Sequence, residues 1–225
     1  MARLQDPTPI PPPTGQDVVV NLNGQAMGPK GLKTRRRLID ATVELLETTS
    51  LRDLRVIDIA RTARGSPATF YVYFPDVSDA VLAAISELSQ ATPAMMEIID
   101  GEWSGQQASA RGAALVETYM RFWGDHRTLF RVRNLSAEEG DRRFIDARAW
   151  SVAPILEAMA KRIEEAQAQN RVPGDLKPPA AAATLLAMLE RLAVVAYSGA
   201  FGGEVTFDGL KASASYFVTM MFQRD

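Results

Sequence analysis

The sequence predicts an all-α protein in which three N-terminal helices are followed by about six more. Apolar residues recur every three or four positions from Lys33 almost to the end of the chain, as on the buried face of an amphipathic helix. The strict alternation of apolar and polar residues that marks a strand is confined to a few positions. Glycine and proline interrupt the periodic stretches, which favours separate helices over one long helix. We therefore expect about nine helices and no sheet.

Composition places the chain among ordinary globular proteins. Of its 225 residues 47% are apolar, which is enough for a sizeable core, and its net charge is only −2. Any surface that binds a polyanion must therefore be local. The chain contains no cysteine, which excludes disulfides and cysteine-ligated zinc and fits a reducing cytoplasm. There is no apolar signal-peptide core and no apolar run of about 18 residues, so we expect a cytoplasmic protein without a membrane span.

Residues 1–29 form a segment of different composition from the rest. They are rich in proline, glycine, glutamine and asparagine, with consecutive prolines at positions 11–13. Proline fixes φ and removes a hydrogen-bond donor, so we expect a flexible, extended arm. Its only apolar run, Val18–Val20, is interpreted as linker.

The first two helices are predicted from apolar spacing. Ile39, Val43 and Leu46 fall at i, i+4 and i+7, which indicates an amphipathic helix of roughly four turns. The pattern returns over two turns between Val56 and Ala63. The second helix is therefore expected to be much shorter than the first.

A third short helix follows a sharply defined turn. Gly65 supplies the turn, Ser66 an N-cap and Pro67 the first helical position. Phe70 and Phe74 then follow four residues apart. We expect both rings to point inward and to hold this helix against the first one.

The remainder of the chain carries the same helical signal. Helices are expected near residues 77–99, 106–124, 126–134, 138–170, 178–200 and 206–222. Glycines between these ranges mark the breaks. Pro93 and Pro154 fall inside two of the ranges, and each is expected to kink or break its helix.

The basic residues are unevenly distributed. Residues 30–83 contain nine Lys and Arg and seven Asp and Glu, a net charge of +2, which leaves −4 for the rest of the chain. Five of the nine cations lie within residues 30–37. A run of like charges is most often a solvated arm. Beside a pair of short helices, it can instead neutralise phosphates and give a salt-dependent affinity for nucleic acid.

Residues 56–74 resemble the helix-turn-helix of the tetracycline-repressor (TetR) family of bacterial transcription regulators. The matching residues are Val56-x-Asp58-Ile59-Ala60-x-x-Ala63 and Ser66-x-x-Thr69-Phe70-Tyr71-x-Tyr73-Phe74. The string from Thr69 to Pro75 looks especially like the branch of the ethionamide-response repressor. The resemblance implies a helix-turn-helix DNA-binding domain over residues 30–90 and a domain for effector binding and dimerisation over residues 91–225. It also implies a homodimer that binds a near-palindromic site in double-stranded DNA.

The resemblance further implies a recognition helix at about 67–73, capped by Ser66. Pro67, Ala68 and Thr69 would face the base edges, where the two apolar residues favour contact with thymine methyls. Tyr71 and Tyr73 resemble phosphate-contacting aromatics of the family, and ordinary half-buried packing is the alternative. The candidate DNA-binding residues are Lys33, Arg35, Arg36, Arg55, Arg64, Ser66, Pro67, Ala68, Thr69, Tyr71 and Tyr73.

Several positions depart from the family pattern. Ser50 stands where a glycine usually ends the first helix, and Arg55 replaces the usual Ser or Thr cap of the second. The turn reads Ala63-Arg64-Gly65 instead of Ala-Gly-Val, so the glycine has shifted by one place. After Phe74 the chain reads Pro75-Asp76-Val77-Ser78-Asp79, where the family commonly has a shorter Ser-Lys-Glu segment. We expect the phosphate contact of that lysine to be lost. Arg55, Arg64 or the N-terminal arm is expected to compensate for it.

Residues 100–225 carry large apolar side chains at helical spacing, most of which we expect in the core. TetR-like proteins hold a small effector in this domain, and such pockets are mostly apolar with a few polar groups. The candidate effector-binding residues are Phe122, Trp123, His126, Phe130, Trp150, Met188 and Tyr197. No charged pair occurs among them, so an apolar or aromatic effector is favoured. His126, the only histidine, is more commonly a packing residue.

The last two helices differ from the others. Residues 180–196 are apolar nearly all round, which requires burial on more than one side. Leu210, Ala214, Phe217 and Met221 give the final helix an apolar stripe. Two such helices from each subunit could form a four-helix bundle at a two-fold dimer interface, as the resemblance implies.

Enzyme chemistry is not indicated. No Gly-x-x-x-x-Gly-Lys-[Ser/Thr] phosphate loop occurs, and one histidine without cysteine cannot build the usual zinc or Ser-His-Asp sites. We expect no catalytic residues, no metal and no cofactor. The favoured function is a ligand-responsive transcriptional repressor. The alternative is a helical small-molecule-binding protein with a weakened or lost DNA-binding head, and an all-helical enzyme is the least favoured.

Overall fold

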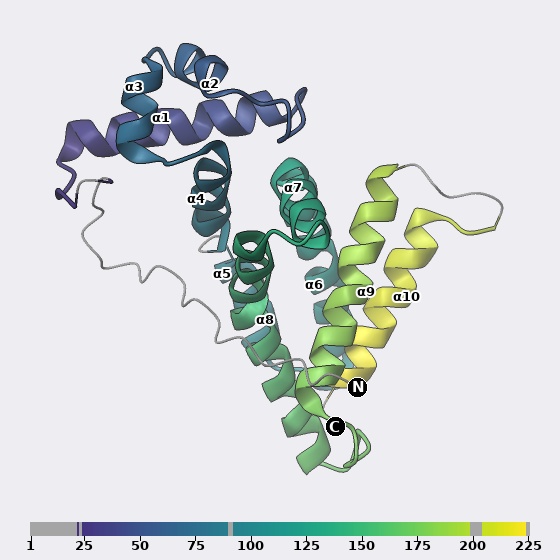
Figure 1. Ribbon diagram of the computed structural model, residues 1–225. Helices are drawn as coiled ribbons and strands as arrows, with labels where there is room; N and C mark the ends of the chain where they lie inside the picture. Colours follow the sequence, from purple (N-terminus) through teal and green to yellow (C-terminus); the bar gives the residue numbers. More distant parts are fainter. Residues whose placement is uncertain (1–21, 23, 90–91, 199–203, 224–225) are drawn as a thin grey trace, which may run out of the picture. The chain divides into compact units, whose positions relative to one another are not determined.

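The computed structural model describes Leu22 and residues 24–89, 92–198 and 204–223. In this part of the chain there are ten helices and no strand (Figure 1), so the all-α class is confirmed. Residues 1–21 and 23, which make up most of the predicted arm, lie outside the described residues. The helices are α1 (Pro29–Leu46), α2 (Val56–Thr62), α3 (Pro67–Tyr73), α4 (Val77–Ser89), α5 (Pro93–Asp100), α6 (Gly105–Asp125), α7 (Arg127–Glu138), α8 (Arg142–Ala168), α9 (Pro178–Ser198) and α10 (Phe207–Phe222).

The two internal prolines, each expected to kink or break a helix, have different outcomes. The stretch 77–99 is divided, because Pro93 occupies the first position of α5 with Thr92 as its N-cap. Seven helices rather than six therefore follow the first three. Pro154 does not break its helix, and α8 continues through it. A proline inside a helix removes one hydrogen bond, and the long flanking stretches of α8 tolerate that loss.

The chain divides into two compact units, and each unit is built from two separate segments of the sequence. The head unit comprises residues 1–90 and Thr128–Ser151, and the body unit comprises residues 91–127 and Val152–Asp225. The head unit therefore holds α1–α4, nearly all of α7 and the first turns of α8. The body unit holds α5, α6, α9, α10 and the rest of α8.

One apolar core joins all parts of the head unit. Phe70 and Phe74 are 0% and 3% exposed, which confirms that both rings point inward. They belong to one cluster with residues of α1, α2 and α4, and also with Leu129, Phe144 and Ala147 of α7 and α8. Because Phe144 is fully buried, the α7–α8 segment is an integral part of the head and not an appendage to it.

The body unit is built around α6, which packs against α5, α9 and α10. Buried Trp103 stacks edge-on against Phe222 with ring centroids 5.0 Å apart, and its indole N–H donates to the carbonyl of Ile99 at 2.9 Å. In α9, residues Pro178–Tyr197 are long and apolar enough to cross a membrane by length and composition alone. This helix packs against α6 and α10; 39% of the apolar stretch is buried, with Ala182, Leu189 and Ala193 among its buried residues.

Candidate nucleic-acid interface

The turn between α2 and α3 is fixed by a Schellman motif. The N–H of Gly65 donates to the carbonyl of Ala60 at 2.7 Å, and the N–H of Arg64 donates to that of Arg61 at 3.0 Å, which is the paired hydrogen-bond pattern of that motif. The residue in the left-handed conformation is Arg64, with φ of 54°. The glycine indeed stands one place beyond the position that needs it, so an arginine bears the steric cost.

The first turn of α3 is capped and exposed. Ser66 is its N-cap, and the Ser66 Oγ accepts a hydrogen bond from the N–H of Thr69 at 3.2 Å, as predicted. The Thr69 hydroxyl lies 3.0 Å from the same oxygen, and Thr69 is half-buried. Pro67 and Ala68 are exposed. Of the three residues predicted to face the bases, Pro67 and Ala68 are thus the most accessible.

The two tyrosines of α3 occupy different environments. Tyr71 is 53% exposed and rests with its ring edge-on to Phe70, with centroids 5.7 Å apart. Tyr73 is half-buried, and its hydroxyl lies beside Gly31 in the first turn of α1. Tyr71 is therefore open to solvent, whereas Tyr73 joins α3 to α1.

Arg35 and Arg36 are held by a carboxylate of the head unit. Arg36 Nη1 lies 2.5 Å from Glu87 Oε2, and its Nε donates to Asp40 at 2.8 Å. Arg35 Nη1 lies 3.7 Å from Glu87, and its guanidinium sits over the ring of Phe74 at 5.3 Å. Burial lowers the pKa of Arg35 and the charge of Glu87 opposes that shift. These contacts tie α1 to α4, so both arginines have structural partners.

A basic stripe on α1, formed by Lys30, Lys33 and Arg37, is the better phosphate-binding candidate. The three residues are exposed and make no ion pair with a carboxylate in the part of the chain that the structure describes. Only Lys33 was among the predicted contacts. The signal that identifies all three is their spacing of i, i+3 and i+7, which places them on one helix face.

The cations of α2 and its turn are also exposed. Arg55 and Arg61 flank Asp58, with Arg55 Nε at 3.0 Å and Arg61 Nη1 at 3.3 Å from its carboxylate oxygens. Arg64 is exposed and has no ion pair among the described residues. Asp58 thus neutralises part of this edge, and Arg61, which the sequence analysis missed, belongs to it as much as Arg55 does.

The turn after α3 is acidic, as the sequence indicated. Asp76 and Asp79 stand there, and both contact Arg143 from the start of α8. Sequence reasoning missed Arg143, because nothing local marks a partner 67 residues away.

The candidate effector residues fall in both units. In the body unit, Trp123 is buried and stacks on exposed Tyr197 at 5.6 Å. Phe122 meets His126 edge-on at 5.1 Å, and Met188 is half-buried in α9. Burial lowers the pKa of His126, so its neutral form is favoured.

The two other candidates, Phe130 and Trp150, belong to the head unit. Phe130 is buried under the guanidinium of Arg133 at 4.9 Å. Trp150 packs against the head core.

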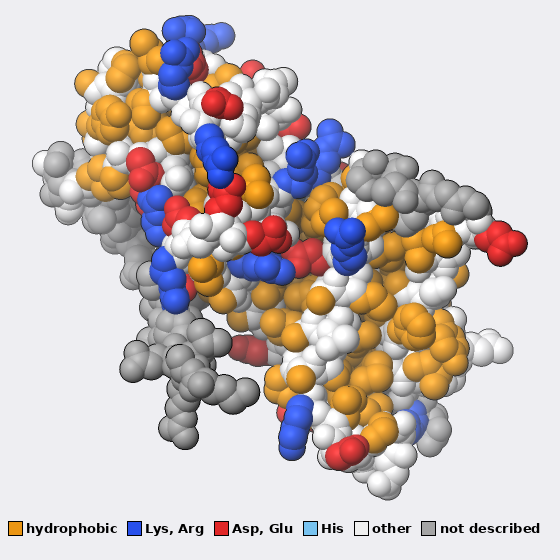
Figure 2. Space-filling view, turned by 45° about the vertical axis from the view of Figure 1, so that its right-hand side comes forward, with side chains coloured by type: hydrophobic (Ala, Val, Ile, Leu, Met, Phe, Trp, Pro, Cys, Tyr) orange, Lys and Arg blue, Asp and Glu red, His pale blue; other side chains and the backbone are white. Residues whose placement is uncertain are grey.

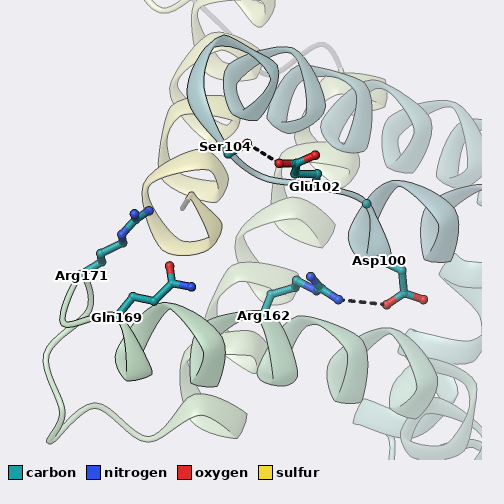
Figure 3. A pocket seen from close by; sticks show the side chains of 7 residues that line it. Asp100, Glu102, Ser104, Arg162, Gln169 and Arg171 are labelled. Carbon is teal, nitrogen blue, oxygen red and sulfur yellow. Dashed lines mark hydrogen bonds and ion pairs between the residues drawn. The ribbon is translucent and has the colours of Figure 1, made fainter. Parts of the chain in front are cut away.

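A cavity of about 640 Å³ opens in the body unit near the start of α6 and the end of α8 (Figure 3). Buried Arg162 points toward Asp100, whose carboxylate is 3.7 Å away, and also lies 3.0 Å from Glu165. The lining residues are Asp100, Gly101, Glu102, Ser104, Arg162, Gln169 and Arg171. None of the seven predicted effector residues lines it, and its mixed charges suit a polar ligand rather than an apolar one.

An apolar face covers α9 and α10, where hydrophobic side chains gather in Figure 2. On α10, Tyr216, Phe217 and Met220 are 60%, 50% and 53% exposed. The opposite side of the same helix is buried through Val218 and Phe222. The final helix is therefore apolar on two sides, and one of them has no partner among the residues that the structure describes.

Comparison with known protein families identifies one match. The family of the tetracyclin repressor-like C-terminal domain matches residues 95–221, which is more than half of the chain. No curated protein matches the sequence.

Solved structures share the fold at low identity. A candidate TetR-family transcriptional regulator from Rhodococcus sp. is 20% identical, with a TM-score of 0.63 over 85% of this chain and 100% of that one. The regulator FadR from Bacillus subtilis in complex with stearoyl-CoA is 16% identical, with a TM-score of 0.64 over 82% and 97%. AibR in complex with isovaleryl coenzyme A and operator DNA is 14% identical, with a TM-score of 0.55 over 86% and 100%. On the family match and the shared fold, the chain belongs to the TetR family of transcriptional regulators.

Proposed function

We propose that the chain is a dimeric repressor that binds a near-palindromic DNA site through α3 and is released by a small molecule. The observation that carries this proposal is the exposed, Ser66-capped first turn of α3, held on the head core by Phe70. A helix presented in this way can enter a major groove with Pro67 and Ala68 against the bases. AibR, which shares the fold, is described with operator DNA.

Phosphate contacts are assigned to the cations around α3. Among these cations are exposed Arg55 and Arg64. The basic stripe on α1 adds Lys30, Lys33 and Arg37. Tyr71 adds a hydroxyl donor. Arg35 and Arg36 remain candidates only if DNA displaces them from Glu87, which lowers their value as contacts.

Dimerisation is assigned to the apolar face of α9 and α10. Large exposed residues such as Tyr216, Phe217 and Met220 on one helix are costly in water and typical of a protein interface. A two-fold pairing of α9 and α10 would cover the same face on both subunits and bring two copies of α3 to successive turns of DNA.

The effector is assigned to the aromatic side chains of the body unit. The supporting contacts are the stacked pair Trp123 and Tyr197 and the edge-on pair Phe122 and His126, and Met188 of α9 adds a flexible side chain. This chemistry fits an apolar or aromatic molecule. The effector would act by binding more tightly to a conformation whose recognition helices do not match the operator.

The alternative is a ligand-binding protein whose head has lost DNA affinity. It is favoured by one observation, the pair of carboxylates at Asp76 and Asp79 on the turn where the family commonly carries a lysine. Two observations oppose this alternative: the Ser66 cap of α3 is intact, and the cations of α1, α2 and the α2–α3 turn are exposed.

Enrichment from a pool of random DNA duplexes distinguishes the two functions. The repressor function predicts that purified protein selects one near-palindromic sequence with half-sites about one helical turn apart. Failure to enrich any sequence, with a folded dimer by light scattering, would favour the ligand-binding alternative.

A further inference from the structure

The turn between α3 and α4 has a local charge that opposes DNA binding. Asp76 is the residue before α4, and its Oδ1 accepts the N–H of Asp79 at 2.9 Å. A helix N-terminus with open N–H groups is a natural site for a phosphate. Here a carboxylate occupies it, and Asp79 places a second carboxylate one turn further on.

Arg143 contacts both of these carboxylates at once. Its Nη1 lies 2.9 Å from Asp76 Oδ2 and 3.0 Å from Asp79 Oδ2. Its Nε and Nη2 donate to Asp141 at 3.3 and 3.1 Å. In the described part of the chain, no other cation pairs with Asp76 or Asp79.

The pKa shifts of Asp76, Asp79 and Arg143 agree with these contacts. Burial raises the pKa of Asp76, but the N–H of Asp79 and the guanidinium of Arg143 outweigh it and hold that pKa below its usual value. Burial and the neighbouring Asp76 raise the pKa of Asp79. The carboxylates of Asp141 and Asp76 raise the pKa of Arg143, so the arginine stays charged.

Arg143 lies next to the head core in the sequence. The next residue, Phe144, is fully buried in the head core, and Arg143 itself follows the turn that joins α7 to α8. On the other side of that turn, Glu139 forms an ion pair with Arg52 in the loop between α1 and α2. Within the head unit, the α7–α8 turn thus contacts two other segments: the loop before α2 and the turn after α3.

We propose that Arg143 is a positioning residue for DNA binding, which offsets part of the negative charge of Asp76 and Asp79 and orients both carboxylates beside the recognition helix. With Arg143 in place, the DNA backbone meets a partly compensated turn; without it, both carboxylates face the phosphates with no cation between them. The inference rests on the proposed function of the head, and it makes the α7–α8 turn part of the DNA-binding machinery.

The test compares Arg143→Gln with Arg142→Gln in the full-length protein. Both variants remove one positive charge at adjacent positions, but among the described residues Arg142 forms an ion pair with Asp146 of its own helix and not with Asp76 or Asp79. We expect Arg143→Gln to weaken binding to the selected DNA about tenfold at low salt, through repulsion between carboxylates and phosphates, and less at high salt. Arg142→Gln is expected to change affinity less than about twofold.

Charge rescue separates this role from a purely structural one. Adding Asp76→Asn and Asp79→Asn to Arg143→Gln removes the exposed charges, while an asparagine at 76 still caps α4. We expect the triple variant to regain most of the affinity, and Arg143→Lys to retain most of it.

Two results would overturn the inference. One is equal affinity of Arg143→Gln and Arg142→Gln, and the other is a loss that persists unchanged in the triple variant. Failure of the unsubstituted protein to bind any DNA selectively would instead overturn the proposed function itself.

Discussion

Gly112 of α6 lies directly against Thr219 of α10, with no room between them for a side chain at position 112. A Cβ there would collide with the Thr219 hydroxyl and stand 2.8 Å from the carbonyl oxygen of Ser215. The Thr219 hydroxyl is itself fixed, since it donates to that same carbonyl at 2.8 Å. The body unit therefore depends on a close contact between two helix backbones.

Gly112→Ala is expected to destabilise the protein by about 1–3 kcal/mol, the usual cost of overpacking a core. Alanine favours the helix itself, so the loss can come only from the contact with α10. The measurement is the free energy of unfolding in denaturant. Gly31→Ala in α1 is the matched control, because a Cβ there meets Met27 at an ordinary 3.4 Å. Equal stability of the two variants would refute this account of the helix contact.

Arg64→Gly is expected to stabilise the head by up to about 1 kcal/mol, because Arg64 holds a left-handed backbone that costs an L-residue about that much. Gly65→Ala is expected to be nearly neutral, since its Cβ would lie 3.8 Å or more from its neighbours at a φ open to any residue. Thermal unfolding in the absence of DNA measures both. If Gly65→Ala costs more stability than Arg64→Gly, the strained backbone position is not Arg64.

The sequence predicted those features of the head that depend on neighbours in the chain. The Ser66 cap, Pro67 at the first position and the inward rings of Phe70 and Phe74 follow from spacing within one or two turns. The same reasoning divided the helix at Pro93. At Pro154 the helix is not broken, because α8 continues for several turns on both sides of the one missing hydrogen bond.

Contacts between distant segments could not be read in this way. Local spacing gives no sign that Phe144 completes the head core or that Arg143 meets Asp76 and Asp79. For the same reason Arg35 and Arg36 looked like free cations, although Glu87 of α4 holds both. The pattern locates residues on a helix face, but only the packing shows what that face touches.

The double substitution Tyr71→Phe and Tyr73→Phe is expected to weaken DNA binding about tenfold for all sequences alike, because it removes hydroxyls that contact the backbone. Substitutions at Ala68 or Thr69 are expected to change which sequence is preferred. Fluorescence anisotropy with two unrelated duplexes and the selected site separates these effects. Unchanged affinity in the double variant would remove both tyrosines from the interface.

If the protein forms the proposed dimer, Phe217→Glu is expected to convert it into a monomer, because the substitution places a charge on the exposed apolar face of α10. Light scattering gives the molar mass directly. Leu135→Glu on α7, where the leucine is 58% exposed, is the matched control and is expected to remain dimeric. A dimer that survives Phe217→Glu would rule out this face as the interface.

Stability is expected to fall as the pH drops below about 6.5, the ordinary pKa of histidine. Burial lowers the pKa of His126 in the folded state, so the unfolded chain binds a proton at a higher pH than the folded one does. The folded state thereby loses stability between the ordinary pKa and the lowered one. His126→Gln is expected to flatten the dependence of the unfolding free energy between pH 7.5 and 5.5, a range set by that pKa. An identical slope in both proteins would assign the effect to other groups.

The most direct test of the account is binding of the purified protein to the DNA upstream of its own gene, at about 50 and 200 mM salt. The account predicts tight binding to one short segment, in competition with random DNA. It also predicts a steep loss of affinity at the higher salt, because clustered cations release counterions. A folded, dimeric protein with no preference for any sequence there or in the random pool would contradict it. The chain would then be a ligand-binding protein whose head no longer recognises DNA.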